Sequence, residues 1–342
     1  MVDTAKLTVE GWFASREKVL SSRLNSALAM PLHKPLRASG HPACAIAGPH
    51  DGAPMSPPSV LISSLGLMGG SLAAALRRVG WPVLLHHRRP EVAVRAQELG
   101  YGKAVTDLTS ALAQTDVVVI CAPVSAIAPT IRLMANLHPR PVFTDVGSVK
   151  GSICNELHDL ASSGRFVGSH PMAGSHLLGI DHARADLYHG CMTILTPLLQ
   201  TPAEPVTLVE KLWRAVGSRL CRLTPEDHDR AVAEASHVPH VLASLAARQL
   251  GAIAAPVAAT GFRDTTRIAG GSPDLWSDIL LHNRQVVNQS LSAARAHLSA
   301  LEQALANDDA TAVRAWLEAG CEGRRRFEQH AVMDVPRLDE ET

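Results

Sequence analysis

The stretch of residues 59–80 joins an apolar segment rich in β-forming residues to a glycine-containing loop and then to a helical segment. The apolar segment reads SVLIS, the loop reads SLGLMGG, and the helical segment GGSLAAALRRVG ends at Gly80, a residue type that commonly follows a helix C-terminus. A strand followed by a glycine loop and a helix is the first unit of a dinucleotide-binding fold. This unit therefore predicts an α/β domain that begins near residue 58.

The sequence after this unit continues to alternate between strand and helix patterns. PVLLHH, DVVVICAP, PVFTDVGS and RFVGSHP predict strands, whereas PEVAVRAQELG and DLTSALAQT predict helices. DVVVICAP is continuously apolar, which is typical of a strand buried on both faces. The alternation predicts a Rossmann-type, doubly wound parallel sheet. We expect this dinucleotide-binding domain to span residues 58–224.

Strand patterns stop near Thr224, and three long helical patterns follow. Thr224 and Pro225 open TPEDHDRAVAEASHVPHVLASLAARQL as N-cap and first helical residue, and Ser272 and Pro273 do the same for SPDLWSDILLHNRQVVNQSLSAARAHLSALEQAL. DATAVRAWLEAGCEGRRRFEQH predicts a last helix. We expect an all-α domain over residues 225–336. Long helices with broad apolar faces often pair between subunits, so we expect a homodimer.

Residues 1–57 differ from the rest because they carry Pro, His, Ala and Ser without periodicity, and we expect a mostly disordered extension. Such a segment fits either an organelle transit peptide or a start codon placed too early, since Met55 lies just ahead of the first strand.

Charge and cysteine content restrict the class of protein. The 342 residues include 32 basic and 32 acidic side chains, and this balance argues against a nucleic-acid or membrane-surface binder. No apolar run is long enough to cross a bilayer. The six cysteines form no C-x-x-C pair, which is typical of reduced thiols in a cytoplasmic protein.

The glycine loop predicts the floor of a cofactor site, formed by Ser64, Leu65, Gly66, Leu67, Met68 and Gly69. Gly66 would let the backbone approach a pyrophosphate, and Gly69 would let the helix pack close to the strand. Ser64 occupies the place of the usual first glycine. It fits there if its φ is negative; otherwise the strain is on the order of 1–3 kcal/mol. The alternative is an ordinary helix-packing glycine cluster.

The second strand ends without the acidic residue that usually binds the ribose of NAD. His87, Arg88 and Arg89 stand there instead. Arginines at this place suit a 2′-phosphate, so among NAD(P) cofactors these residues favour NADP. The alternative is a solvated basic turn.

Ser148 and His170 follow or end two of the predicted strands, where ligands of a parallel sheet bind. A histidine fixed by the following Pro171 is a candidate general base for a small-molecule substrate. A lone histidine is more often structural, but Gly147, Gly151 and Gly168 predict tight turns around a pocket.

Five motifs in order, LGLMGGSLA, TDVGSVKG, GSHPMAG, SHVPH and GFRDTTRIA, resemble those of the prephenate/arogenate dehydrogenase family of tyrosine biosynthesis. The resemblance spans about residues 59–328. It implies NAD(P)-dependent oxidative decarboxylation of prephenate, arogenate or both. Ser64, His87 and His176 depart from the family's usual glycine, acid and glutamate.

The resemblance also implies roles for single residues. His170 would take the proton of the substrate's ring hydroxyl while hydride leaves the same carbon, and Ser148 would orient His170 and touch the cofactor. Arg267 would bind the substrate carboxylate. The remaining substrate contacts implied are Ser236, His240, Arg263 and Ser175. Ser236 favours prephenate. Too few residues follow Arg326 for a regulatory domain, so we expect tyrosine to inhibit at the active site.

Two other classes of function stay open. A β-hydroxyacid dehydrogenase would share the architecture but needs a lysine early in the helical domain, and no lysine follows Lys211. A non-catalytic NAD(P)-binding sensor would explain Ser64 but not Ser148, His170 and Arg267. A zinc site at His228, His237 and His240 lacks clear ligand spacing, so we expect no metal and a structural role for His237.

Overall fold

A computed structural model of the chain describes residues 57–174 and 177–333. The predicted extension lies outside the described residues except for Pro57, and so do Ser175, His176 and residues 334–336. Within the described ranges, no helix is both long and apolar enough to cross a membrane.

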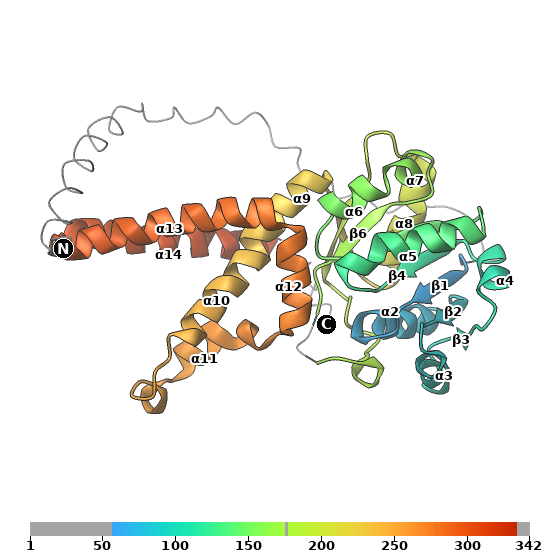
Figure 1. Cartoon of the computed structure of the whole chain (residues 1–342), viewed down its shortest axis with the longest axis horizontal. Helices are drawn as coiled ribbons and strands as arrows, with labels where there is room; N and C mark the ends of the chain where they lie inside the picture. Colours follow the sequence, from blue (N-terminus) through green and yellow to red (C-terminus); the bar gives the residue numbers. More distant parts are fainter. Residues whose placement is uncertain (1–56, 175–176, 334–342) are drawn as a thin grey trace, which may run out of the picture. The chain divides into compact units, whose positions relative to one another are not determined.

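The first part of the chain is a five-stranded parallel sheet covered by helices on both faces (Figure 1). The predicted fold class is therefore confirmed. The strand order is β3-β2-β1-β4-β5, and the strands are β1 (Val60–Ser63), β2 (Val83–His86), β3 (Lys103–Ala104), β4 (Val117–Ile120) and β5 (Val142–Asp145).

Alternating side chains of the sheet enter two separate cores, as expected for strands buried on both faces. Val60 and Ile62 pack with helices α2 (Leu67–Arg78) and α3 (Pro90–Glu98), whereas Leu61 faces the opposite core. That opposite core contains α4 (Leu108–Ala113), α5 (Val124–Leu137), α6 (Gly151–Glu156) and α7 (His158–Ser162).

The strand predicted in RFVGSHP forms, but it does not extend the parallel sheet. It becomes β6 (Gly168–Pro171), which pairs antiparallel with β7 (Met192–Thr196) in a second sheet. β7 pairs in parallel with β8 (Arg219–Arg222) across helix α8 (Ala203–Ala215). Among the described residues, the backbone bridge between this segment and β5 is limited to Phe143 and Phe166. Further along, side-chain hydrogen bonds join β6 to β5, and the β6 backbone pairs with β7.

The second part of the chain is helical, and its first two predicted helix starts are correct. Thr224 Oγ1 accepts a hydrogen bond from the backbone N–H of Asp227, and Ser272 Oγ accepts one from Leu275. The predicted continuous helix after Thr224 contains a π-helical turn. The elements are α9 (Pro225–Val232), the π-helix Ala233–His237, α10 (Val238–Arg248), α11 (Thr260–Thr266), the 3₁₀ helix Arg267–Gly270 and α12 (Pro273–His282).

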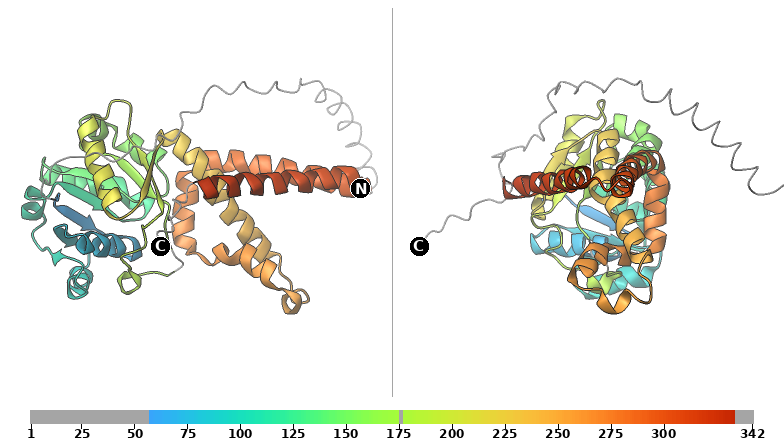
Figure 2. Two further views of the ribbon diagram at one scale, coloured as in Figure 1. Left: turned by 180° about the vertical axis from the view of Figure 1, so that it is seen from behind. Right: turned by 90° about the vertical axis from the view of Figure 1, so that its left-hand side faces the viewer.

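The long helix predicted after Ser272 is two helices, because the chain bends at Asn283 (φ −105°, ψ 23°). The Asn283 side chain donates to the backbone oxygen of Asp229, 2.9 Å away. Beyond the bend, α13 (Arg284–Ala306) and α14 (Ala310–Met333) lie side by side (Figure 2). The indole N–H of Trp316 donates to the carbonyl of His297 and joins them.

Candidate active site

The glycine loop joins β1 to the N-terminus of α2 and is shaped by its backbone. Ser64 has a φ of 74°, so the condition that a serine fits there with a negative φ is not met. Its backbone N–H still donates to the carbonyl of His86. An L residue in the left-handed region carries about 1–2 kcal/mol of steric cost, which glycine avoids.

Gly66 and Gly69 differ in the space around them. A Cβ at Gly66 would meet nothing within 4 Å, so the space above this residue is open. A Cβ at Gly69 would overlap the carbonyl oxygen of Ser64 and lie 3.2 Å from the Cβ of Cys121. Within the part of the chain that the structure describes, no side chain caps the start of α2, and its first turn has no acidic residue. The free N–H groups and the positive end of the helix dipole therefore fit a pyrophosphate.

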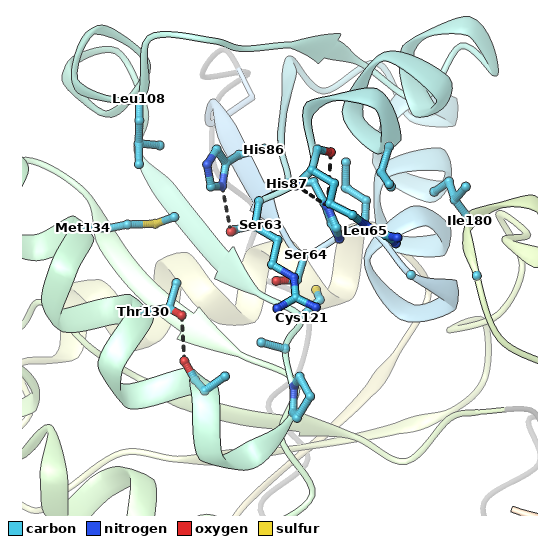
Figure 3. A pocket seen from close by; sticks show the side chains of 18 of the residues that line it. Ser63, Ser64, Leu65, His86, His87, Leu108, Cys121, Thr130, Met134 and Ile180 are labelled. Atoms are coloured by element: carbon cyan, nitrogen blue, oxygen red, sulfur yellow. Dashed lines mark hydrogen bonds between the residues drawn. The ribbon is translucent and has the colours of Figure 1, made fainter. Parts of the chain in front are cut away.

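A cavity of about 900 Å³ opens from this loop towards the end of β2 (Figure 3). Ser64, Leu65 and Gly66 line it, together with the three residues His87, Arg88 and Arg89. The backbone N–H of Arg89 donates to Nδ1 of His87, 3.0 Å away. Burial lowers the pKa of His87; the hydrogen bond with the backbone of Arg89 opposes this effect, and the charges of Arg89 and Arg88 add to it. The positive charge here therefore comes from the two exposed arginines.

A second cavity of about 400 Å³ shares Gly66 and Cys121 with the first and contains both predicted catalytic residues. Leu67 and Met68 of the glycine loop line it. Ser148 lies on the turn between β5 and α6, and His170 lies on β6. The two cavities together are large enough for a dinucleotide beside a small substrate.

The imidazole of His170 is buried and held by a second histidine. Its Nδ1 lies 2.8 Å from Nε2 of His228, and Nδ1 of His228 lies 2.8 Å from Oδ1 of Asp229. The resemblance assigns the orienting role to Ser148, but the structure gives Nδ1 of His170 this other partner. Burial holds the pKa of His170 well below its usual value, and His228, Lys150 and His237 add to the lowering. His170 is therefore neutral near pH 7 and able to accept a proton.

A buried ion pair supports the strand that carries His170. Lys150 and Asp145 pair with both side chains fully buried. Asp145 Oδ1 accepts the N–H of Ser169 (3.1 Å), and Lys150 Nζ donates to the carbonyl of Ser169 (3.0 Å). The pair thus satisfies both backbone groups of the residue that precedes His170.

The predicted substrate contacts of the helical domain lie outside the residues that line this cavity. Arg263 and Arg267 are exposed, on α11 and at the first position of the following 3₁₀ helix, and Arg263 pairs with Asp264. Ser236 is half-buried in the π-helical turn. Ser175 lies outside the described residues.

Two buried histidines of the helical domain have nitrogen atoms without partners. His240 stacks on Trp276 with ring centroids 3.5 Å apart, and its Nδ1 has no hydrogen-bond partner among the described residues. Nδ1 of His237 lies 3.2 Å from Nδ2 of Asn283, whereas its Nε2 has no partner in the same part of the chain. Burial lowers the pKa of His237 to about 4. Both rings can accept a hydrogen bond from a bound molecule.

Sequence reasoning considered His228 only as a metal ligand and did not single out Asp145, Lys150 or Asp229. The sequence contains a weak signal, the adjacent His228 and Asp229 on a helix that begins at the domain junction. Their pairing with His170 depends on a contact across 58 residues of chain, which no local pattern reports. Within the described residues, no cluster of three or more His, Cys, Asp or Glu side chains is arranged to hold a metal ion.

Comparisons with known proteins agree on one family. Residues 72–222 match the nucleotide-binding domain of prephenate dehydrogenase, and residues 224–319 match the prephenate dehydrogenase dimerization domain. A cyclohexadienyl dehydrogenase of Zymomonas mobilis is 34% identical over 73% of this chain and 89% of its own length. A prephenate dehydrogenase of Bacillus subtilis is also 34% identical, over 67% of this chain and 65% of its own length.

Solved structures give the same result. The prephenate dehydrogenase of A. aeolicus, in complex with hydroxyphenyl propionate and NAD+, superposes with a TM-score of 0.73 at 28% identity, covering 80% of this chain and 99% of that one. Synechocystis arogenate dehydrogenase superposes with a TM-score of 0.70 at 30% identity, covering 79% and 99% of the two chains.

Proposed function

Because the chain belongs to the prephenate dehydrogenase family, we propose that it catalyses the NAD(P)-dependent oxidative decarboxylation of prephenate, arogenate or both. The observation that carries this proposal is the position of His170. It is a buried, neutral imidazole in a cavity that it shares with Ser148 and that continues into the cofactor cavity.

The residues that would hold the dinucleotide fit its two charged parts. The open backbone at Gly66 and the uncapped start of α2 suit the pyrophosphate. Bound NAD(P) supplies the hydride acceptor. His87, Arg88 and Arg89 at the far end of the cavity suit a ribose 2′-phosphate, and on this ground we propose NADP as the preferred cofactor.

His170 acts as the general base on the substrate. It accepts the proton of the ring hydroxyl while the carbinol carbon loses hydride, and the ring then becomes aromatic as carbon dioxide leaves. A base in the correct position contributes about 10²–10⁴-fold to the rate. Ser148 lies in the same cavity and would hold the substrate hydroxyl or the cofactor. Decarboxylation needs no metal, because aromatisation drives it.

The substrate's anionic groups require partners from the helical domain. We propose Arg267 for the carboxylate, since a guanidinium can bind it through two hydrogen bonds. Ser236, His240, Arg263 and Ser175 complete the proposed contacts. The buried Nδ1 of His240, which has no partner among the described residues, supports its inclusion. Because Arg263 and Arg267 are exposed, this part of the proposal requires substrate to bind between them and the cavity.

We also propose a homodimer and a division into two domains at residues 224 and 225. The last strand, β8, ends at Arg222 and α9 begins at Pro225. The match of residues 224–319 to a dimerization domain supports a dimer built by the helical part. Cysteines without C-x-x-C spacing favour the cytoplasm as the compartment.

A four-way assay tests the activity directly. Purified enzyme is given prephenate or arogenate with NAD or NADP, and reduced nicotinamide is followed by absorbance. We expect turnover with at least one pair and a higher kcat/KM with NADP. His170→Asn should lose at least about 10²-fold in kcat and keep its cofactor affinity.

The exposed histidine of α7 provides the matched control, and His158→Asn should behave like the wild type. No turnover with any of the four pairs would refute the proposed activity. A His170→Asn enzyme that retained most of its kcat would refute the assignment of the base.

A further inference from the structure

His170 is one end of a line of three side chains that runs from β6 to α9. Nδ1 of His170 meets Nε2 of His228 at 2.8 Å, and Nδ1 of His228 meets Oδ1 of Asp229 at 2.8 Å. His228 is fully buried, and His170 and Asp229 are more than nine-tenths buried. Water therefore does not compete for these hydrogen bonds, and each of them fixes the next.

The hydrogen bonds determine which nitrogen atoms carry protons. An ionised Asp229 carboxylate only accepts, so Nδ1 of His228 must donate to it. Nε2 of the neutral His228 then accepts, and Nδ1 of His170 must donate to it. The remaining nitrogen of His170, Nε2, is left with a free lone pair. This is the form that a general base needs at the nitrogen turned away from His228.

Asp229 is itself fixed by the loop that carries Ser148. Its Oδ1 accepts the backbone N–H of Lys150 (2.7 Å) and its Oδ2 accepts that of Gly151 (2.8 Å). A Cβ at Gly151 would lie 2.7 Å from Oδ2, so glycine is required for this approach. The carboxylate therefore connects both catalytic candidates, Ser148 through its loop and His170 through His228.

We infer that His228 and Asp229 form a proton relay behind His170, a role that rests on the proposed function. When Nε2 of His170 takes the substrate proton, the Nδ1 proton of His170 passes to Nε2 of His228. The positive charge then lies on His228, beside the Asp229 carboxylate. After the product leaves, the reverse transfer returns a proton through Nε2 of His170 to water in the cavity. In each cycle the relay receives one proton from the substrate and releases one proton to water, and only N–H and O–H bonds form or break.

The charged and titratable groups around the relay favour this position for the charge. Burial lowers the pKa of His228, and Asp229 raises it, whereas no carboxylate of the described residues raises the pKa of His170. The groups that face the two imidazoles are Lys150 from the loop before α6, Asp145 from β5, His237 from the π-helical turn and Asp229 from α9.

Three substitutions separate a relay from a structural role. His228→Gln places an amide oxygen near the position of Nε2, where it can accept from His170 but cannot carry a proton. His228→Asn reaches Asp229 but not His170. Asp229→Asn removes the negative charge. The matched control is His282→Gln, since His282 and Asp278 form another histidine–aspartate pair, 3.3 Å apart on α12.

We expect His228→Gln to lose about 10–100-fold in kcat, with KM changed by less than about threefold, and His228→Asn to lose more. The apparent pKa of the acid limb in the kcat/KM profile should shift in opposite directions in two of the variants. In His228→Gln this pKa should rise, because the neighbour that lowers the pKa of His170 is gone. In Asp229→Asn it should fall, because the relay loses its stabilising carboxylate. His282→Gln should change neither quantity.

The relay would be overturned if His228→Gln kept the wild-type kcat. It would also be overturned if the apparent pKa of the acid limb shifted in the same direction in His228→Gln and Asp229→Asn. Failure of the proposed function is distinguishable, since it would appear in the wild type as an absence of turnover. Proton NMR detects the imidazole N–H groups without any substrate. The relay is supported if a downfield N–H signal of the wild type is lost in both His228 variants and kept in His282→Gln. The relay is overturned if the wild type has no such signal.

Discussion

Ser64 has a backbone conformation that favours glycine, because its φ is 74°. Replacing it by glycine removes the clash of its Cβ, although glycine loses more conformational freedom on folding. We expect Ser64→Gly to raise the free energy of unfolding by about 1 kcal/mol and Tm by about 2–4 °C. Thermal unfolding followed by circular dichroism measures this change.

Ser163→Gly is the matched control for Ser64, since Ser163 is exposed and has a φ of −82°. It should be neutral or destabilising. An equal gain in both variants would mean that the conformation of Ser64 carries no strain.

His170 must be neutral to act as a base, and its pKa is lowered chiefly by burial. The protonated, inactive form therefore accumulates only well below pH 6.5. As the pH is lowered, we expect kcat/KM to stay constant down to pH 6.5 and to decline below it. Initial rates of the wild type, measured over a range of pH, test this expectation. An acid limb centred at or above pH 6.5 would contradict the buried, neutral state.

Arg88 and Arg89 are the exposed cations at the ribose end of the cofactor cavity. Loss of a hydrogen bond to a charged group costs about 1.5–3 kcal/mol. Replacing both arginines by alanine should raise KM for NADP at least about tenfold, with KM for NAD changed by less than about threefold. Arg78→Ala, at the exposed end of α2, is the control. An equal change in KM for NADP and for NAD would show that Arg88 and Arg89 do not discriminate between the two cofactors.

At the scale of elements, β6 is held beside β5 by side chains where a backbone ladder is lacking. Asp145 and Lys150 bind the two backbone groups of Ser169 and pair with each other, with no exposed surface. Lys150→Met leaves the buried carboxylate without its cation and should cost about 3–5 kcal/mol in urea unfolding. The double substitution Asp145→Asn with Lys150→Met should cost less than the single one.

Lys211→Met, on the exposed face of α8, is the matched control and should leave stability within about 0.5 kcal/mol of the wild type. If Lys150→Met had an equally small effect, the ion pair would not be what holds β6 in place.

At the scale of the whole molecule, α13 and α14 bury little of their apolar surface. Val287 and Ala304 are the buried residues of α13, and Leu298, Leu305, Leu317 and Phe327 are exposed on the pair. A helix pair with so much exposed apolar surface indicates an interface. Light scattering should give about twice the 36.4 kDa chain mass. Leu305→Glu with Leu317→Glu should shift the protein to the monomer.

The corresponding control is Leu199→Glu, since Leu199 is 98% exposed on the loop before α8. A monomeric wild type, or a dimer unaffected by both glutamates, would exclude this surface as the interface.

The sequence by itself determined those features that depend on neighbours in the chain. Periodicity and short-range sterics account for the strand–loop–helix unit, for the caps at Thr224 and Ser272, and for the close packing at Gly69. Ordered motifs were also sufficient to indicate the family. Each of these signals lies within a short window of sequence, where local preference and final structure agree.

Tertiary structure alone decided the partners of buried polar groups. β6 pairs with β7 in a second sheet and not with the parallel sheet that the sequence predicts. The predicted long helix bends at Asn283, whose side chain bonds to the backbone of Asp229. His228 became the partner of His170 across 58 residues. Buried donors and acceptors must be satisfied wherever the fold provides a partner, and the sequence contains no local record of which distant group that will be.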